Sequence, residues 1–321
     1  MAMTLNDMKV GMTDKVSEQV VDIFVRESEI LQALPFDNCV SPGGGSTLTY
    51  SYLQTLLPSM ATFRGLNTEY TANEATLVKR SADLKIFGGK FSMDRVLKQA
   101  EGKFNNMAFQ MEQKIKAAVG LFHYTLINGD ATTNALEFDG LDKMLAGTTS
   151  EFNADGTLDI STMELLKANA DQFYEMLQNL IKATDADALL LNTATISKIQ
   201  TMARLLGYKT ESEEAFGRKI TTMDGVRFMD LKNTYSQGSG APVATPCVPV
   251  ASGGLTDIYA VKFDVNDGFH GVTLTGNSGI SQYVPDFTKP GAVKDGEVEM
   301  VAATVLKNTA HAGVIRNVKL V

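Results

Sequence analysis

The sequence contains no tryptophan, only three histidines and two cysteines. His123, His270 and His311 each stand alone, without a second histidine or cysteine at the spacing that metal sites use. We therefore predict no metal site. Cys39 and Cys247 lie far apart in the sequence and fit a reducing compartment better than a disulfide framework. The lack of tryptophan, with the other aromatic residues scattered, argues against a surface on which single-stranded bases stack.

Positive charge is also in short supply. The chain has 29 Lys and Arg against 37 Asp and Glu, a formal net charge of −8. This balance argues against a protein that binds nucleic acid by its phosphates, although an acidic wall can enclose DNA without binding it. No apolar run approaches the length of a membrane span, and the N-terminus lacks the pattern of a signal peptide. We expect a folded cytoplasmic protein with no membrane partner.

Motifs of catalysis are missing as well. The glycine-rich segment 41–46 has no Gly-Lys-Ser/Thr and precedes a strand, so it is interpreted as a hinge and not as a phosphate loop. Residues 276–279 lack the spacing of a hydrolase nucleophile elbow. The acidic run 211–214 is typical of a solvated surface. The sequence therefore predicts no catalytic residues, no cofactor and no enzyme activity.

The most informative feature present is a long amphipathic helix, expected from about Lys103 to Asn128 and closed by Gly129. At 1.5 Å per residue it would be a rod of roughly 40 Å. Its apolar positions recur at steps of three and four and so share one face. They are Phe104, Ala108, Met111, Ile115, Ala118 and Phe122.

Before this helix, two strand-like runs at 48–53 and 76–87 enclose a polar tip of about 20 residues, a length that in a loop indicates function or disorder. A two-stranded ribbon buries too little surface to be stable alone. Residues 1–38 contain a narrow amphipathic helix that Pro35 ends. Its apolar positions are Val16, Val20, Phe24 and Leu31.

After the helix, residues 151–285 have the pattern of a compact α/β region. We expect a capping box at 161–164, a buried strand at 188–191, a helix at 195–206 and a hairpin around Asp224-Gly225. Residues 237–254, rich in Gly, Pro and Ser, are predicted to be a mobile loop. Two more strands are expected between Glu297 and Val321.

The long helix runs into Asn128-Gly129-Asp130 and then Phe138-Asp139-Gly140-Leu141. This arrangement resembles the major capsid proteins of tailed double-stranded DNA bacteriophages, which have the HK97 fold. The resemblance implies an α+β chain with an N-terminal arm, an extended-loop hairpin, a peripheral domain built on this "spine" helix, and an axial α/β domain. The implied boundaries are arm 1–40, hinge and hairpin 41–91, peripheral domain 92–150, axial domain 151–285, and return strands of the peripheral domain 286–321.

As function, the resemblance implies a structural protein that self-assembles through hexamers and pentamers into an icosahedral shell around double-stranded DNA, without sequence-specific contacts. Such a protein is located in the virion and is assembled in the host cytoplasm. Many members of this family carry an N-terminal scaffolding region, but here arm and hairpin account for residues 1–91. Either scaffolding comes from a separate protein or the chain is already processed; Met1 favours the first, so we expect a separate scaffolding protein, and also a portal. Candidate contacts between subunits are Phe24 and Arg26 on the arm, and Arg64 and Glu69 on the hairpin tip.

Two alternatives remain. An encapsulin has the same fold and encloses cargo proteins in place of DNA. An intracellular α/β enzyme, with the axial region as its catalytic domain, would need a convergent polar pocket that the sequence does not indicate.

We predict that the shell is held together without covalent links. Some relatives join subunits by an isopeptide bond from a lysine on the extended loop, but residues 55–75 contain no lysine. Arg64, their only basic residue, stays protonated and is a poor nucleophile. Particles boiled in detergent with reductant should run as one band near 34.7 kDa. A ladder of larger species would show that a lysine outside the tip reaches a neighbour.

Overall fold

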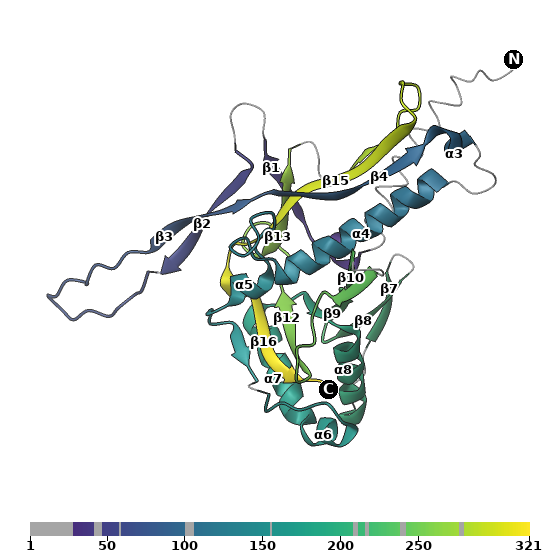
Figure 1. Cartoon of the computed structure of the whole chain (residues 1–321). Helices are drawn as coiled ribbons and strands as arrows, with labels where there is room; N and C mark the ends of the chain where they lie inside the picture. The colour runs from purple at the N-terminus through teal and green to yellow at the C-terminus, as the bar shows by residue number, and fades with distance from the viewer. Residues whose placement is uncertain are drawn as a thin grey trace, which may run out of the picture.

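A computed structural model describes residues 28–41, 47–57, 59–99, 106–154, 156–207, 211–215, 218–237, 242–275 and 279–321. Figure 1 shows a body built on two sheets, with one long helix lying against both and one long hairpin projecting away from it. The long helix is α4 (Asn106–Asn128). None of the helices in the described ranges combines the length and the hydropathy needed to cross a membrane.

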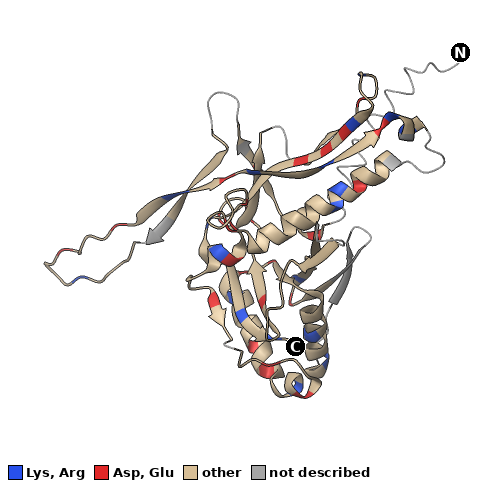
Figure 2. Cartoon of the chain, viewed as in Figure 1, with Lys and Arg blue, Asp and Glu red and all other residues tan. Residues whose placement is uncertain are grey.

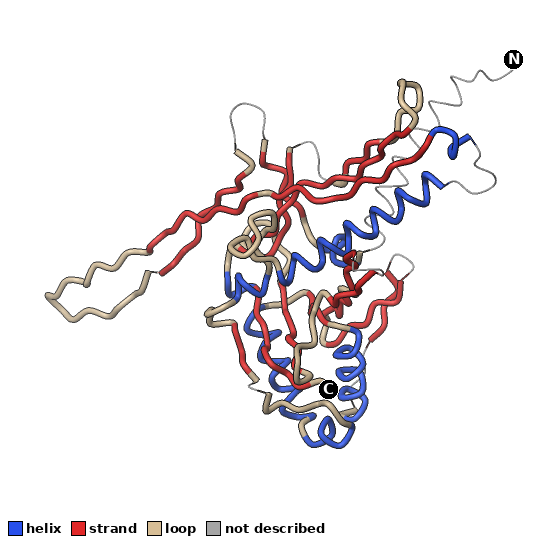
Figure 3. The backbone as a smooth tube through the Cα atoms, in the orientation of Figure 1, coloured by secondary structure: helices blue, strands red, loops and turns tan. Residues whose placement is uncertain are grey.

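The first sheet has five strands, drawn with the other strands in red in Figure 3. Its members are β1 (Phe36–Val40), β13 (Phe269–Leu274), β15 (Val293–Leu306), β14 (Ser281–Tyr283) and β4 (Lys85–Asp94), the last paired with β15. The β4–β15 ladder is antiparallel over ten residue pairs, from Val293↔Asp94 to Ala302↔Lys85. This ladder pairs a strand that precedes α4 with a strand about 200 residues later, close to the C-terminal end of the sequence.

The second sheet has seven strands in the order β5 (Glu151–Asn153), β16 (Ala312–Lys319), β12 (Leu255–Val261), β6 (Ala188–Leu191), β9 (Val226–Asp230), β8 (Arg218–Met223) and β7 (Glu211–Ala215). Asp224 and Gly225 both have positive φ between β8 and β9, which confirms the predicted hairpin turn. The helices α6 (Met163–Ala168), α7 (Ala170–Thr184) and α8 (Thr193–Leu205) pack on this sheet and on one another.

The seven-stranded sheet separates two apolar cores. In β6, Ala188 and Leu190 point into the core that contains α4, whereas Leu189 and Leu191 point into the core beneath α7 and α8. All four side chains are fully buried, as the short apolar run predicted. Successive side chains of a strand face opposite sides, so one strand stabilises both cores.

Helix α4 buries the predicted face from Met111 onward. Ile115 and Phe122 are among the largest fully buried side chains, and Ala118 lies in the same core. Ala108, expected on this face, is exposed, because the start of α4 projects beyond the body together with β4 and β15 (Figure 1). Phe104 lies outside the described residues.

Several expected elements differ in the structure. The helix N-cap is Thr162, which accepts a hydrogen bond from Leu165 N, so the capping box predicted to begin at Ser161 is wrong. Part of the segment 237–254 is not a loop: β11 (Pro242–Pro246) pairs with β10 (Asn233–Gln237), and β10 contacts α4. The pairing with β10 provides hydrogen-bond partners for the backbone of β11, although β11 begins and ends with proline.

Two strands lie in a different sheet from the one expected. The resemblance implies that β16 belongs to the peripheral domain together with the long helix, but β16 pairs with β12 and β5 in the seven-stranded sheet. β13 was assigned to the axial region, but it pairs with β15 and β1. The alternation of apolar residues identifies a strand, but it does not specify which of two apolar sheets the strand joins.

A chain of buried hydrogen bonds connects Ser28, just before α2, to the long helix and to Leu231. Ser28 caps the short helix α2 (Glu29–Ala33), and its Oγ lies 2.6 Å from Nε2 of His123 on α4. Nδ1 of His123 lies 3.1 Å from the carbonyl oxygen of Leu231, so the neutral ring donates there and accepts from Ser28. Burial lowers the pKa of His123 from 6.5 to about 4.

The depressed pKa predicts a loss of stability in acid. Folding keeps His123 neutral, so its contribution is complete above pH 6.5 and is lost as the pH falls toward 4. At pH 5 the loss amounts to about 2 kcal/mol of unfolding free energy. Denaturant titrations at pH 7 and pH 5 should show it, and His123→Gln should reduce the difference between the two pH values. An unchanged difference in this variant would contradict the assignment.

Candidate subunit interface

The hairpin of β2 (Thr49–Leu57) and β3 (Thr76–Asp83) ends in a tip, residues 59–75, in which every residue is exposed. Four bulky apolar side chains of the tip are exposed: Met60 (74%), Phe63 (106%), Leu66 (95%) and Tyr70 (63%). Figure 3 shows the tip as a long loop far from the body. Burying each such side chain is worth about 1.5–3 kcal/mol, so the tip has a strong tendency to bind apolar surface. An exposed apolar cluster of this kind marks an interaction site.

The tip nevertheless has a defined local structure. Thr68 Oγ1 donates to Gly65 O at 2.9 Å, and Met60 N donates across the loop to Asn73 Oδ1, also at 2.9 Å. Asn67 adopts a positive φ of 61°, as asparagine tolerates in turns. The apolar side chains are therefore presented by a folded loop.

Two of the predicted contact residues lie together on this tip. The Arg64 guanidinium sits 5.3 Å from the centre of the Tyr70 ring and donates to Thr68 O at 3.3 Å. Glu69 is exposed beside them, and Figure 2 shows that charges are sparse along the tip. Phe24 and Arg26 fall outside the described residues. Sequence reasoning missed the four apolar residues, although their presence in a polar segment without periodicity was a usable signal.

The root of the hairpin is fixed to the body. Tyr52 Oη donates to Leu306 O at 3.4 Å, and Gln54 Nε2 donates to Lys307 O at 3.1 Å. Tyr50 stacks on Tyr52 with 6.1 Å between the ring centres and contacts the edge of buried His270 at 6.0 Å. The root thus sets the direction of the hairpin while the tip is free to contact another molecule.

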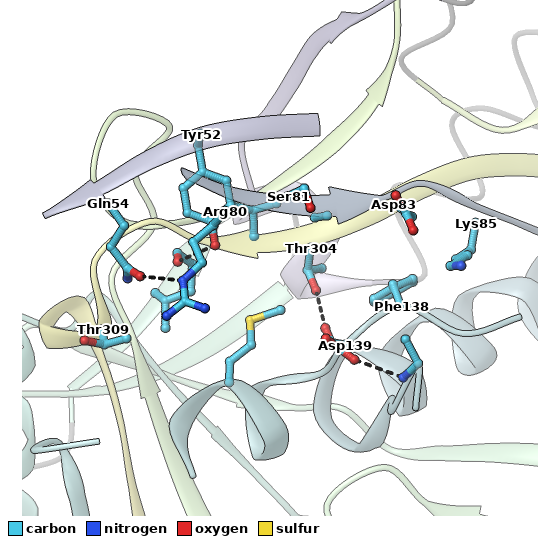
Figure 4. Close-up of a pocket in the computed structure, with 15 residues that line it drawn as sticks. Tyr52, Gln54, Arg80, Ser81, Asp83, Lys85, Phe138, Asp139, Thr304 and Thr309 are labelled. Atoms are coloured by element: carbon cyan, nitrogen blue, oxygen red, sulfur yellow. Dashed lines mark hydrogen bonds between the residues drawn. The ribbon is translucent and has the colours of Figure 1, made fainter. Parts of the chain in front are cut away.

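A polar cavity of about 380 Å³ opens beneath this root (Figure 4). Arg80 donates to Gln54 Oε1 at 3.3 Å, and Thr304 Oγ1 donates to the carbonyl oxygen of Asp139 at 3.3 Å. No serine, cysteine or histidine paired with a base is among its lining residues. Within the described ranges, no group of three or more His, Cys, Asp or Glu is arranged to hold a metal ion. The cavity gives no support to the enzyme alternative.

The chain is similar to known proteins in its structure, whereas comparisons of its sequence find no match. No protein-family model matches the chain, and no curated protein matches it. The holo-SrpI encapsulin complex from Synechococcus elongatus matches with a TM-score of 0.60 at 12% identity, over 90% of this chain and 87% of the other. The capsid of a native GTA particle matches at 0.56 and 10% identity, over 90% and 89%. A structure from Mycobacterium phage Bobi matches at 0.55 and 13% identity, over 90% of each chain.

The chain has the HK97 fold. This confirms both the resemblance noted from the sequence and the predicted α+β class. In the terms of the HK97 fold, α4 is the spine helix and the β2–β3 hairpin is the extended loop. At identities of 10–13% the likeness concerns the path of the backbone and leaves the choice between capsid and encapsulin open.

The motif that carried the resemblance has a structural role in this HK97-fold chain. Lys143, Thr132 and Thr133 donate to the Asp130 carboxylate and hold its pKa far below the usual range. Asp139 Oδ1 accepts from Ala131 N at 2.9 Å and so closes the loop after the spine helix. The motif therefore fixes the end of the spine helix.

A second polar cluster behind this loop joins three strands of the seven-stranded sheet to the short helix that follows the loop. Arg316 on β16 donates to Glu151 at 2.5 Å, to Asp257 at 3.1 Å, and to Asp142 at the start of α5 (Leu141–Leu145). Burial, together with Asp142 and Asp257, raises the pKa of Tyr259 far above its usual range, so its hydroxyl stays protonated and donates to Asp142. Sequence reasoning did not find this cluster, because its members are up to 174 residues apart.

The loop geometry predicts that Gly129 is irreplaceable. A Cβ on Gly129 would overlap the backbone oxygen of Phe138 and lie only 2.5 Å from that of Thr125. Gly129→Ala should therefore cost about 2 kcal/mol or more of unfolding free energy. Gly279→Ala is the matched control, since its added Cβ meets no atom within 4 Å. Equal denaturation midpoints for the two variants would refute this role of Gly129.

Proposed function

We propose that the protein is a subunit of a self-assembling icosahedral shell. The observation that carries the proposal is the extended-loop tip, whose four large apolar side chains have no core of their own. The HK97 fold shared with an encapsulin and a GTA capsid supports it. In such a shell each copy places its tip on a neighbour. Each contact is weak, but the many contacts together stabilise the closed particle.

Within this proposal, residues 1–40 act as the arm, 41–91 as hinge and extended loop, 92–150 as the spine-helix domain, and 151–285 as the axial domain. The return segment 286–321 contributes β15 to the first sheet and β16 to the second. Phe24, Arg26, Arg64 and Glu69 are proposed to contact neighbouring subunits. A separate scaffolding protein and a portal are proposed partners.

For the contents of the shell we propose double-stranded DNA, as in a phage capsid. The net charge of −8 suits a wall that encloses DNA without binding its phosphates. An encapsulin is the second candidate, favoured by the match to an encapsulin complex with a TM-score of 0.60. Particles purified from the producing host, treated with nuclease and then opened, should release long DNA. Release of a cargo protein without DNA would establish the encapsulin alternative.

Assembly is predicted to depend on the tip. Phe63→Asp should leave the subunit folded, because Phe63 is fully exposed, and should abolish shells, because a charge would have to be buried in the contact. Phe63→Leu keeps an apolar side chain and is the matched control, which should still assemble. Circular dichroism and sedimentation velocity measure fold and assembly on the same sample.

Wild-type protein that sediments as a monomer at every concentration and salt would refute the shell itself. Normal shells from Phe63→Asp would refute only the role of the tip.

A further inference from the structure

The polar cavity beneath the hairpin root contains a cation for which the described residues provide no anion. In the β2–β3 ladder Arg80 lies directly opposite Tyr52, so the two side chains share one face of the hairpin. Tyr52 Oη donates to Leu306 O, so this face is turned toward the body. Among the ion pairs of the described residues, none includes Arg80. A guanidinium group therefore lines the cavity without a carboxylate that compensates its charge.

The position of this guanidinium is set by a neighbouring side chain. Nε of Arg80 donates to Oε1 of Gln54 at 3.3 Å, and Gln54 in turn donates to Lys307 O at 3.1 Å. The contact uses the Nε–H group and leaves the terminal N–H groups for another partner. In Figure 4 the terminal nitrogens of Arg80 point away from Tyr52 and into the cavity. The planar fork that they form matches a carboxylate or a phosphate, which it can bind through two parallel hydrogen bonds.

The two carboxylates among the lining residues have other partners. Asp139 Oδ1 accepts from Nζ of Lys143 at 2.8 Å, and Asp83 Oδ1 accepts from Oγ1 of Thr49 at 2.7 Å. Neither carboxylate is paired with Arg80, so the charge of the guanidinium is left for an anion from solution.

We propose that this cavity binds a small organic anion, whose carboxylate or phosphate group lies on the fork of Arg80. The volume of about 380 Å³ falls within the range of small-molecule sites. Thr309 adds a hydroxyl group to the lining, and the half-buried side chains of Tyr52 and Met144 add apolar surface for the carbon atoms of the ligand. A few polar groups that orient a ligand beside apolar surface are typical of such sites.

A bound anion would connect the hairpin to the body. Arg80 belongs to β3, whereas Thr309 belongs to the short helix η1 (Thr309–His311), which follows β15. The root is attached to the body by Tyr52 and Gln54, and a ligand held from both sides would add a further attachment. Binding should therefore restrict the motion of the hairpin. This inference does not depend on the proposed shell.

Titration calorimetry of the purified protein tests the site. The anionic probes are citrate and glycerol 3-phosphate, and glycerol is the uncharged control, each added at low ionic strength. We expect saturable binding of at least one of the two anions, no binding of glycerol, and weaker anion binding as salt is added. Arg80→Gln should lower the affinity at least about tenfold, because it removes hydrogen bonds between charged groups.

Lys79→Gln is the matched control variant. Lys79 lies opposite Leu53 in the ladder, so its side chain is on the other face of the hairpin, while the loss of charge is the same. Its affinity should stay within about twofold of the wild type, because an exposed charge on the far face is screened. Circular dichroism of both variants checks that they are folded.

Hydrogen exchange of the wild type provides a readout that needs no variant. With the anion bound, the backbone amides of β2 and β3 should exchange more slowly, because opening of the hairpin would first require release of the ligand.

Three results would each overturn the inference. They are the absence of saturable binding of either anion up to about 10 mM, an equal loss of affinity in Arg80→Gln and Lys79→Gln, and unchanged exchange in the hairpin when the anion is bound. A carboxylate of a neighbouring copy is a second source of the same chemistry. Binding by dissociated chains but not by assembled particles would assign the cavity to that carboxylate and would also overturn the proposal of a small molecule.

Discussion

The spine helix has to bury one apolar face, and every other part of the chain is arranged around that requirement. Ile115 and Phe122 are fully buried in a core that also receives side chains from α2, β15 and the seven-stranded sheet. These partners come from both ends of the sequence, so the helix cannot be covered until the chain has nearly all been made. Contacts of such long sequence separation carry a large loop-closure cost before they stabilise the fold. The wide, shared core offsets that cost.

What the sequence predicted well was local. The spacing of Met111, Ile115 and Phe122 depends only on the helical repeat, and the helix ends at Asn128 as expected. The left-handed turn expected at Gly129 is wrong, because Gly129 does not have a positive φ. The hairpin at Asp224-Gly225 follows likewise from two residues that tolerate positive φ. The sheet that β16 joins was not predictable in this way. In that sheet Arg316 of β16 meets Asp142 and Asp257 from distant segments, and no local pattern specifies those partners.

The same division holds for the candidate interface. A long segment without a core could be recognised in the sequence as a contact element, since nothing nearby would cover it. Arg64 and Glu69 were chosen there for their charge, whereas the structure shows that exposed Phe63 and Leu66 present far more apolar surface. The cluster of Phe87, Phe122 and Phe138 beside the hairpin root could not be predicted, because its rings come from β4, from α4 and from the loop after α4, and only the packing of the spine helix brings them together.

A hairpin tip that binds a different surface of a neighbouring copy makes a heterologous contact, in which each copy contributes a different surface. Unless two copies exchange their tips reciprocally in a two-fold dimer, such contacts continue until a ring closes or a filament grows. In the proposed shell the hairpin root influences this outcome, because Tyr52 and Gln54 fix the direction in which the tip is presented. A root held by only a few hydrogen bonds and stacked rings permits small changes of that direction. The proposed icosahedral shell requires such a tolerance, because one sequence has to close rings of five and of six subunits.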